Sequence, residues 1–171
     1  MKPKLIIVTG EPGSGKSSLV KALAKELCLP YISRDELKEG YVDELGKSHE
    51  ELPPETNKYI TELFFGTIEQ ILSEGGALIA EAAFQHKVWS HFLSPMMAKC
   101  ELKVLICKTS LAAERRKSRA AADPRHEYYH GKANFDEMSY EEPRLCPETY
   151  HIDTSESYAP SIPELKEILL K

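Results

Sequence analysis

Short apolar runs alternate along the chain with longer segments in which apolar side chains recur every three or four residues. The runs are typical of strands buried on both faces of a sheet, and they predict strands at residues 5–8, 30–33, 77–80, 102–107 and 150–152. The periodic segments are typical of helices that cover a sheet, and they predict helices at residues 17–28, 59–73, 88–99, 111–122 and 162–169. This alternation predicts a parallel sheet with helices on both faces.

Two polar segments, residues 39–56 and 123–147, do not fit this pattern and carry most of the proline, histidine and tyrosine. We interpret them as flaps, because functional loops of such folds gather over the carboxyl ends of the strands.

The sequence from Gly10 to Ser17, GEPGSGKS, matches the phosphate-binding pattern G-x-x-x-x-G-K-[ST] in full. A predicted strand precedes it and a predicted helix follows it, which is the arrangement that the motif requires. In such a loop the backbone N–H groups surround phosphate oxygens, the lysine reaches the terminal phosphates, and the serine hydroxyl binds Mg²⁺. The residues expected to bind ATP here are Gly10, Gly13, Ser14, Gly15, Lys16, Ser17 and Ser18.

Other classes of P-loop protein fit the sequence less well than a small kinase. Asp43–Gly46 matches the D-x-x-G of GTPases but does not follow a buried strand, and Asn57–Ile60 lacks the aspartate that would read guanine. A ring ATPase would need a helical lid domain and an Asp-Glu pair after the third strand, and the sequence predicts neither.

A kinase needs a base for the acceptor hydroxyl, and Asp35 lies just past the second strand, where that base is expected. The alternative is that Asp35 caps the following helix. Glu81 ends the third strand, where an acid can complete the Mg²⁺ shell or orient the acceptor; the alternative is a surface glutamate. The expected acceptor-side residues are Arg34, Asp35, Lys38, Glu81 and Phe84, and the expected metal-binding residues are Ser17 and Glu81.

The predicted helix 111–122 is basic, and Arg115 and Arg119 share one of its faces because they are four residues apart. We expect at least one arginine among Arg115, Arg116, Arg119 and Arg125 to contact phosphate, although a solvated basic helix is the alternative. With Lys16 and Asp35, Arg119 completes the expected catalytic set.

In these motifs the chain resembles small P-loop kinases of the group that includes zeta-toxin-like, chloramphenicol phosphotransferase-like and phage polynucleotide kinase-like proteins, with an ATP-binding AAA-type kinase domain. The resemblance is carried by residues 10–17, 33–39, 80–84, 115–119 and 152–155. It implies the strand order 2-3-1-4-5, ATP with Mg²⁺, and Asp35 as the base. It also implies that Arg119 is a lid arginine and that Asp153 and Thr154 lie near the adenine. Glu81 departs from the group, since many relatives have aspartate there.

Together these features predict a three-layer α/β P-loop fold and one kinase domain, residues 1–171. Residues 39–74 would form an acceptor-side helical region and residues 111–147 a lid. The predicted activity is transfer of the γ-phosphate of ATP to a hydroxyl of a small molecule. The alternatives are a polynucleotide 5′-hydroxyl kinase and a nucleotide-dependent switch or ATPase without an acceptor.

The charge distribution sharpens the expected acceptor. The chain has 22 Lys and Arg against 27 Asp and Glu, a formal net charge of −5, which disfavours a nucleic-acid partner. Residues 35–56 hold eight acids against two lysines, whereas residues 113–132 hold six bases against three acids. A basic lid above an acidic entrance predicts a neutral or cationic acceptor.

Composition also bears on location. The four cysteines form no C-x-x-C pair and are expected to be reduced and mostly buried. The apolar run at residues 5–8 is too short for a signal peptide, and no segment is long enough for a membrane span. We therefore expect a cytoplasmic protein with no membrane partner.

Overall fold

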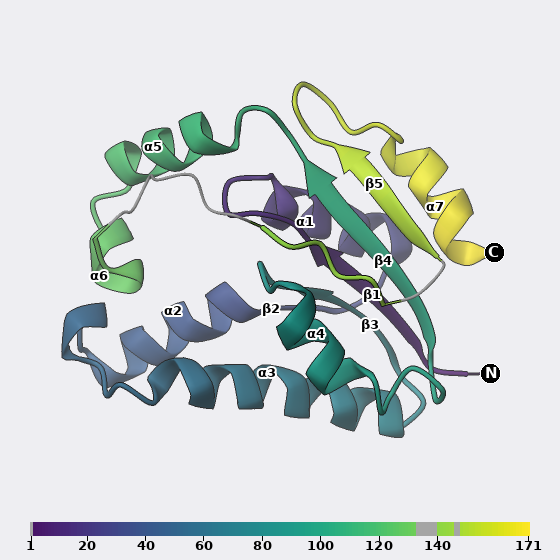
Figure 1. Cartoon of the computed structure of the whole chain (residues 1–171), viewed down its shortest axis with the longest axis horizontal. Helices are drawn as coiled ribbons and strands as arrows, with labels where there is room; N and C mark the ends of the chain where they lie inside the picture. The colour runs from purple at the N-terminus through teal and green to yellow at the C-terminus, as the bar shows by residue number, and fades with distance from the viewer. Residues whose placement is uncertain (1, 133–139, 146–147) are drawn as a thin grey trace.

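A parallel five-stranded sheet forms the centre of the chain (Figure 1). The computed structural model describes residues 2–132, 140–145 and 148–171. The strands, in spatial order, are β2 (Tyr31–Ser33), β3 (Ala77–Glu81), β1 (Lys4–Thr9), β4 (Glu101–Lys108) and β5 (Thr149–Asp153). The predicted strand order 2-3-1-4-5 is confirmed.

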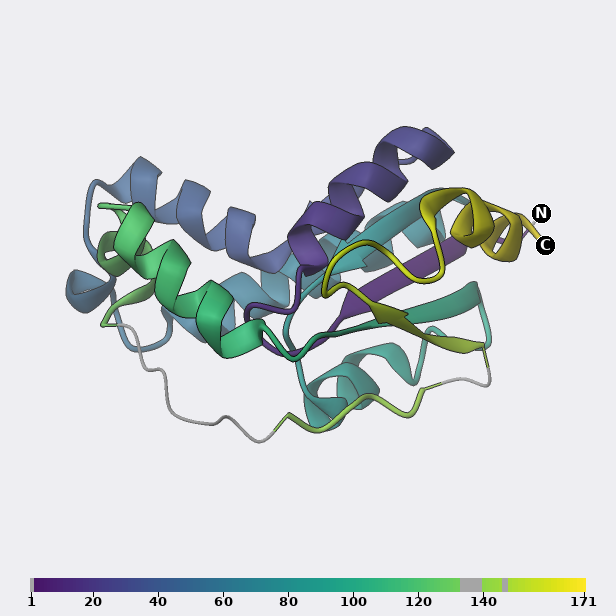
Figure 2. The same ribbon diagram turned by 90° about the horizontal axis from the view of Figure 1, so that it is seen from above.

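Helices cover both faces of this sheet, as the alternation of strands and helices predicts. The covering helices are α1 (Lys16–Leu27) and α7 (Ile162–Leu170) on one face, and α3 (Thr56–Ser73) and α4 (His86–Leu93) on the other. Alternate residues of β1 serve the two sides: Ile6 and Val8 pack with the first pair, and Leu5 and Ile7 with the second. Figure 2 shows α1 and α4 on opposite sides of the sheet. This arrangement is the three-layer α/β fold.

Three further helices lie beyond the carboxyl ends of the strands. They are α2 (Arg34–Leu45), α5 (Ala112–Ala122) and α6 (His126–His130). α6 contacts both α2 and a short 3₁₀ turn, His49–Glu51, so the two sides meet over the edge of the sheet (Figures 1 and 2). Among the described residues, no helix is long and apolar enough to cross a membrane.

The structure differs from the sequence expectations in two elements. Residues 39–45, expected in a flap, belong to α2. This helix has only a sparse apolar stripe, and the residues buried along it are Lys38 and Val42. α4 ends at Leu93 instead of residue 99, since Pro95 has no N–H group with which to continue the helical hydrogen bonding. Of the expected flap 123–147, residues 133–139 and 146–147 lie outside the described residues.

A buried hydroxyl fixes the end of β1, where the phosphate-binding loop begins. Thr9 is fully buried; its Oγ1 donates to the Ala82 carbonyl oxygen at 2.8 Å and accepts from Nε1 of Trp89 at 3.1 Å. The Tyr140 hydroxyl lies 2.8 Å from Thr9 Oγ1. Trp89 is therefore a buried packing residue that also holds the start of the loop through Thr9.

Replacing this hydroxyl should destabilise the fold. Thr9→Val keeps the shape of the side chain but leaves buried polar partners unpaired, and we expect it to lower the free energy of unfolding by about 1–3 kcal/mol in urea titrations. The control is Thr61→Val, whose hydroxyl bonds to a carbonyl oxygen on the surface of α3; it should cost less than about 0.5 kcal/mol. Equal losses for the two variants would contradict this role of Thr9.

Candidate active site

The phosphate-binding loop joins β1 to α1, and its shape depends on three glycines. Gly10, Gly13 and Gly15 have φ angles of 145°, 87° and 84°, which other residues rarely adopt. At Gly10 a Cβ atom would lie only 2.6 Å from the Cys107 carbonyl oxygen, so the loop packs directly on β4. The sequence motif therefore forms the expected strand–loop–helix structure.

Thr154 holds the loop from the opposite side. Its side chain is buried, and its Oγ1 donates to the Ser14 carbonyl oxygen at 2.7 Å. This hydroxyl therefore supports the loop. The expected proximity of Asp153 and Thr154 to an adenine stays a prediction. Asp153, by contrast, is exposed and lines a second hollow together with Thr109, Ser110 and Ser155.

Lys16 begins α1 and is 6% exposed. Its Nζ donates to the Glu11 carbonyl oxygen of the same loop at 2.9 Å. Burial lowers the pKa of this lysine, whereas the nearby carboxylates of Glu81 and Asp35 act in the opposite direction. A buried ammonium group with a neutral acceptor is well suited to bind an anion such as phosphate.

Glu81 is the last residue of β3 and is paired in register with Val8 of β1. It is 2% exposed, so the alternative of a surface glutamate is wrong. Its Oε2 accepts from Ser33 Oγ at 2.6 Å and from Ser17 Oγ at 3.5 Å. Burial raises the pKa of Glu81, although Ser33 and Lys16 oppose that shift. The expected metal-binding pair, Ser17 and Glu81, is thus in contact.

Asp35 lies in the first turn of α2, but it is not the cap of that helix. Ser33 is the cap, and its Oγ accepts from the backbone N–H of Glu36. The Asp35 side chain is 53% exposed, and its Oδ1 lies 3.7 Å from Nη1 of Arg34. The carboxylate is therefore available at the wall of the cavity described next.

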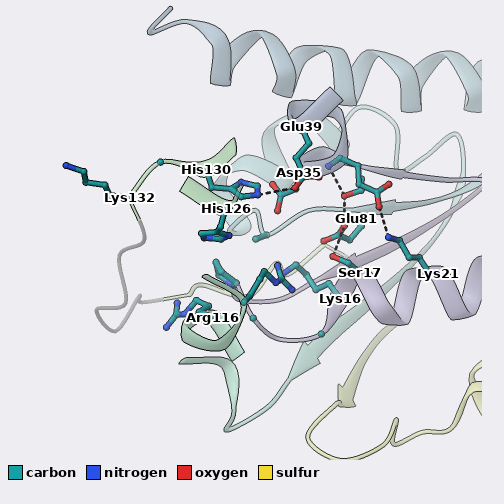
Figure 3. Close-up of a pocket in the computed structure, with 18 residues that line it drawn as sticks. Lys16, Ser17, Lys21, Asp35, Glu39, Glu81, Arg116, His126, His130 and Lys132 are labelled. Carbon is teal, nitrogen blue, oxygen red and sulfur yellow. Dashed lines mark hydrogen bonds and ion pairs between the residues drawn. The ribbon is translucent and has the colours of Figure 1, made fainter. Parts of the chain in front are cut away.

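A cavity of about 490 Å³ joins these groups (Figure 3). The loop and α1 form one side, and α2 with α6 and the residues after it forms the other. Its lining includes Gly13, Gly15, Lys16, Ser17, Lys21, Ser33, Asp35, Glu36, Glu39, Glu81, Ala83, Arg116, Arg119, His126, His130 and Lys132.

The four arginines of residues 115–125 divide between two tasks. Arg116 and Arg119 line the cavity. Arg115 instead donates from Nη2 to the carbonyl oxygens of Thr154 and Ser155, at 2.6 and 2.8 Å. Arg125 pairs with Asp43 of α2 at 2.6 Å, so it too contacts protein. Arg115 therefore does not line the cavity with Arg119 but supports the chain after β5, with Nη1 3.4 Å from where a Cβ atom of Gly15 would lie. Its expected contact with ATP stays a prediction.

Arg116 has hydrogen-bond donors that an anion could engage. Its Nε and Nη1 atoms are buried and have no hydrogen-bond partner among the described residues. Its Cγ lies against Gly13, where a Cβ atom would be 3.0 Å away. The Arg116 side chain therefore lies beside the loop, and its unpaired donors are of the kind that a phosphate can bind.

Residues 5–141 match the AAA domain family AAA_33. The chain belongs to this family of small P-loop kinases. No protein with a curated description matches the sequence.

Solved structures agree with the family. A candidate kinase from Chloroflexus aurantiacus J-10-fl has a TM-score of 0.84 at 26% identity, over 99% of this chain and 100% of that one. The Mycobacterium tuberculosis APS kinase CysC, solved with AMPPNP and APS, has a TM-score of 0.67 at 16% identity, over 99% of each chain. A chain of the Pnkp1/Rnl/Hen1 RNA repair complex has a TM-score of 0.60 at 17% identity, over 71% of this chain and 39% of that one.

In this P-loop kinase, three of the expected acceptor-side residues do not line the cavity. Arg34 donates from Nη2 to Asn57 Oδ1 at 2.9 Å. Lys38 is buried and donates to His49 Nδ1 at 2.7 Å. Phe84 packs against Phe65 and Trp89. Ala83, one residue before Phe84, takes its place on the wall.

The sequence analysis missed several residues that line the kinase cavity. Glu39 follows Asp35 by one helical turn, so the shared spacing could have identified it once α2 was recognised as a helix. His126 and His130 are four residues apart, and this spacing could have placed them on one face of a helix. They line the cavity, and no group of three metal-binding side chains occurs in the described part of the chain.

Replacing Glu81 should separate its expected metal role from its effect on stability. In Glu81→Gln the amide oxygen can still accept from Ser33, but the buried charge is gone. In this variant the gain in nucleotide affinity that Mg²⁺ produces should be about 10- to 100-fold smaller than in wild type. Calorimetry with and without the metal measures this gain.

The same substitution should weaken the effect of Mg²⁺ but raise the stability of the fold. Because the folded pKa is raised, ionisation of Glu81 opposes folding. Wild type should thus lose stability relative to Glu81→Gln as the pH rises above the ordinary glutamate value of 4.5. Glu62→Gln, on the exposed side of α3, is the control and should alter neither property. Unchanged Mg²⁺ dependence in Glu81→Gln would remove Glu81 from the metal site.

Proposed function

We propose that this kinase transfers the γ-phosphoryl group of ATP to a hydroxyl group of a small neutral or cationic molecule. The observation that carries the proposal is the position of Asp35. Its carboxylate faces the same cavity as Lys16 and forms only a loose contact, 3.7 Å, with Arg34. A carboxylate placed in this way can accept a proton from a bound hydroxyl group.

The proposed step is an in-line displacement. The hydroxyl oxygen bonds to the γ-phosphorus, and the bond from that phosphorus to the β–γ bridging oxygen breaks. ADP leaves with the electron pair, and Asp35 takes the hydroxyl proton. Lys16 stabilises the charge of the terminal phosphates.

Mg²⁺ fits the oxygen groups next to Lys16. The Ser17 hydroxyl and the buried carboxylate of Glu81 are in contact, and oxygen ligands are those that Mg²⁺ prefers. These two residues would hold the ion, which supplies neutralisation of phosphate charge when it is bound. The raised pKa of Glu81 is consistent with a carboxylate that needs a cation beside it.

Two arginines would complete the phosphate site. Arg116 has unpaired donors beside Gly13, and Arg119 lines the same cavity. Both come from α5, so they can stabilise charge that develops on the transferring group. We assign Arg116 to the phosphates together with Arg119, the arginine expected from the sequence.

The alternative functions make different predictions about the label of [γ-³²P]ATP. A polynucleotide 5′-hydroxyl kinase would label oligonucleotides, and a nucleotide-dependent switch would release the label only as inorganic phosphate. The three carboxylates on the α2 side, Asp35, Glu36 and Glu39, disfavour a polyanionic acceptor in this cavity. We therefore place the small-molecule kinase first.

Replacing Asp35 tests the proposed base. Asp35→Asn keeps the size of the side chain but cannot accept the proton, so we expect kcat for phosphoryl transfer to fall by about 10²–10⁴-fold. The affinity for ATP should stay within about threefold of wild type, because Asp35 is not expected to bind the nucleotide. Transfer to pooled metabolites is followed with [γ-³²P]ATP, and affinity is measured by calorimetry.

Glu36→Gln is the matched control for this substitution. It removes one negative charge from the same helical turn and the same cavity, but Glu36 is paired with Lys21 at 2.9 Å. Glu36→Gln should retain most of the activity. If both variants lose activity equally, or if Asp35→Asn keeps it, Asp35 is not the base.

A further inference from the structure

The acceptor half of the cavity carries less free charge than the sequence indicates. Glu36 pairs with Lys21 at 2.9 Å, and Glu39 Oε1 lies 3.0 Å from Nε2 of His130. Asp35 is the carboxylate of this wall that has no comparably close pairing among the described residues. Two of the three acids that face the acceptor are therefore already engaged.

The acid one turn further along α2 is engaged in the same way. Asp43 accepts from Arg125 at 2.6 Å and from the Tyr129 hydroxyl at 2.9 Å. The acidic excess of residues 35–56 is thus partly used to hold α6 against α2. It does not act on the acceptor as a free negative field.

The ring of His126 lines this half of the cavity and carries an unpaired hydrogen-bonding atom. Its Nδ1 is buried and has no hydrogen-bond partner in the part of the chain that the structure describes. Burial and the neighbouring His130 lower the pKa of His126, which favours a neutral ring at pH 7. Figure 3 shows both histidines near Asp35 and Glu39, whereas Lys132 extends away from them. A buried ring nitrogen without a partner marks a bond that a ligand can supply.

We propose that the acceptor is a small uncharged polyol, with one hydroxyl group at Asp35 and another at His126. This inference rests on the proposed kinase function and narrows its acceptor. A hydroxyl group both donates and accepts hydrogen bonds, so it suits the neutral ring of His126 in either tautomer and the carboxylate of Asp35 equally well.

Charged acceptors fit this half of the cavity less well. An anion would meet the carboxylate of Asp35, which has no close pairing to offset its charge. A cation would pair with Asp35, and a nearby positive charge stabilises the ionised carboxylate and reduces its ability to take a proton. A ligand with a single hydroxyl group, bound at Asp35, would leave the buried nitrogen of His126 unpaired.

The test offers four classes of acceptor with [γ-³²P]ATP and Mg²⁺. Glycerol, erythritol and myo-inositol represent uncharged polyols, gluconate a sugar acid, glucosamine an amino sugar, and a 5′-hydroxyl oligonucleotide the nucleic acids. We expect label in at least one of the polyols. His126→Phe should raise KM for that polyol about tenfold or more, while kcat and KM for ATP change less than about threefold.

Two further variants make the test specific to His126. His126→Asn keeps a side chain that donates and accepts, and it should restore much of the lost affinity. His91→Phe, on the exposed side of α4, is the control and should leave KM unchanged. If His126→Phe does not fold, the unmodified protein still gives an answer, since the polyol should shift the ring ¹⁵N resonances of His126 in the presence of AMPPNP.

The possible failures can be told apart. Label only in gluconate, glucosamine or the oligonucleotide would overturn the polyol inference and leave the kinase proposal standing. An unchanged KM in His126→Phe, or unshifted His126 resonances, would remove His126 from the acceptor site. Label only in inorganic phosphate, across all acceptors, would contradict the proposed function itself.

Discussion

The arrangement of the site depends on a buried positive charge, the ammonium group of Lys16. It is 6% exposed and donates to a carbonyl oxygen of its own loop. Removing an ammonium ion from water is costly, so its position requires strong compensation. Glu81 supplies part of it through the electric field, since its buried carboxylate favours the charged lysine. The remainder is what bound phosphates would supply.

The rest of the fold keeps these two charges in place. The parallel register puts Glu81 beside Val8, one residue before the Thr9 anchor. Thr9 and Thr154 then fix the loop from its start and its middle through buried hydroxyl groups. At the far side, contacts between α2 and α6 join the two walls of the cavity. Two of the acids of α2, Glu39 and Asp43, therefore serve to hold α6 in place.

Much of this arrangement could be predicted from the sequence. The loop motif and the alternation of strands with helices predict the parallel sheet and the position of Lys16, because both are local patterns with known geometry. The order of the strands was predicted from the resemblance to small P-loop kinases. The structure corrected features that depend on packing. The extent of α2 was not recognised because few of its residues are buried. Arg115 was grouped with Arg119, although Arg119 lines the cavity and Arg115 does not. Adjacent residues of a helix point about 100° apart, and only the packing of α5 shows which of its arginines reaches the loop. Pairings between distant segments, such as Asp43 with Arg125, leave no signal in a single sequence.

A crystal structure with AMPPNP and Mg²⁺ would test the central claim most directly, because it would show where the Lys16 ammonium group and the metal lie. We predict that Lys16 Nζ leaves the Glu11 carbonyl oxygen to bind the terminal phosphates. The metal should lie between those phosphates and the oxygens of Ser17 and Glu81, with Arg116 on the phosphates. A nucleotide bound elsewhere, with Lys16 still hydrogen-bonded to Glu11, would contradict the account.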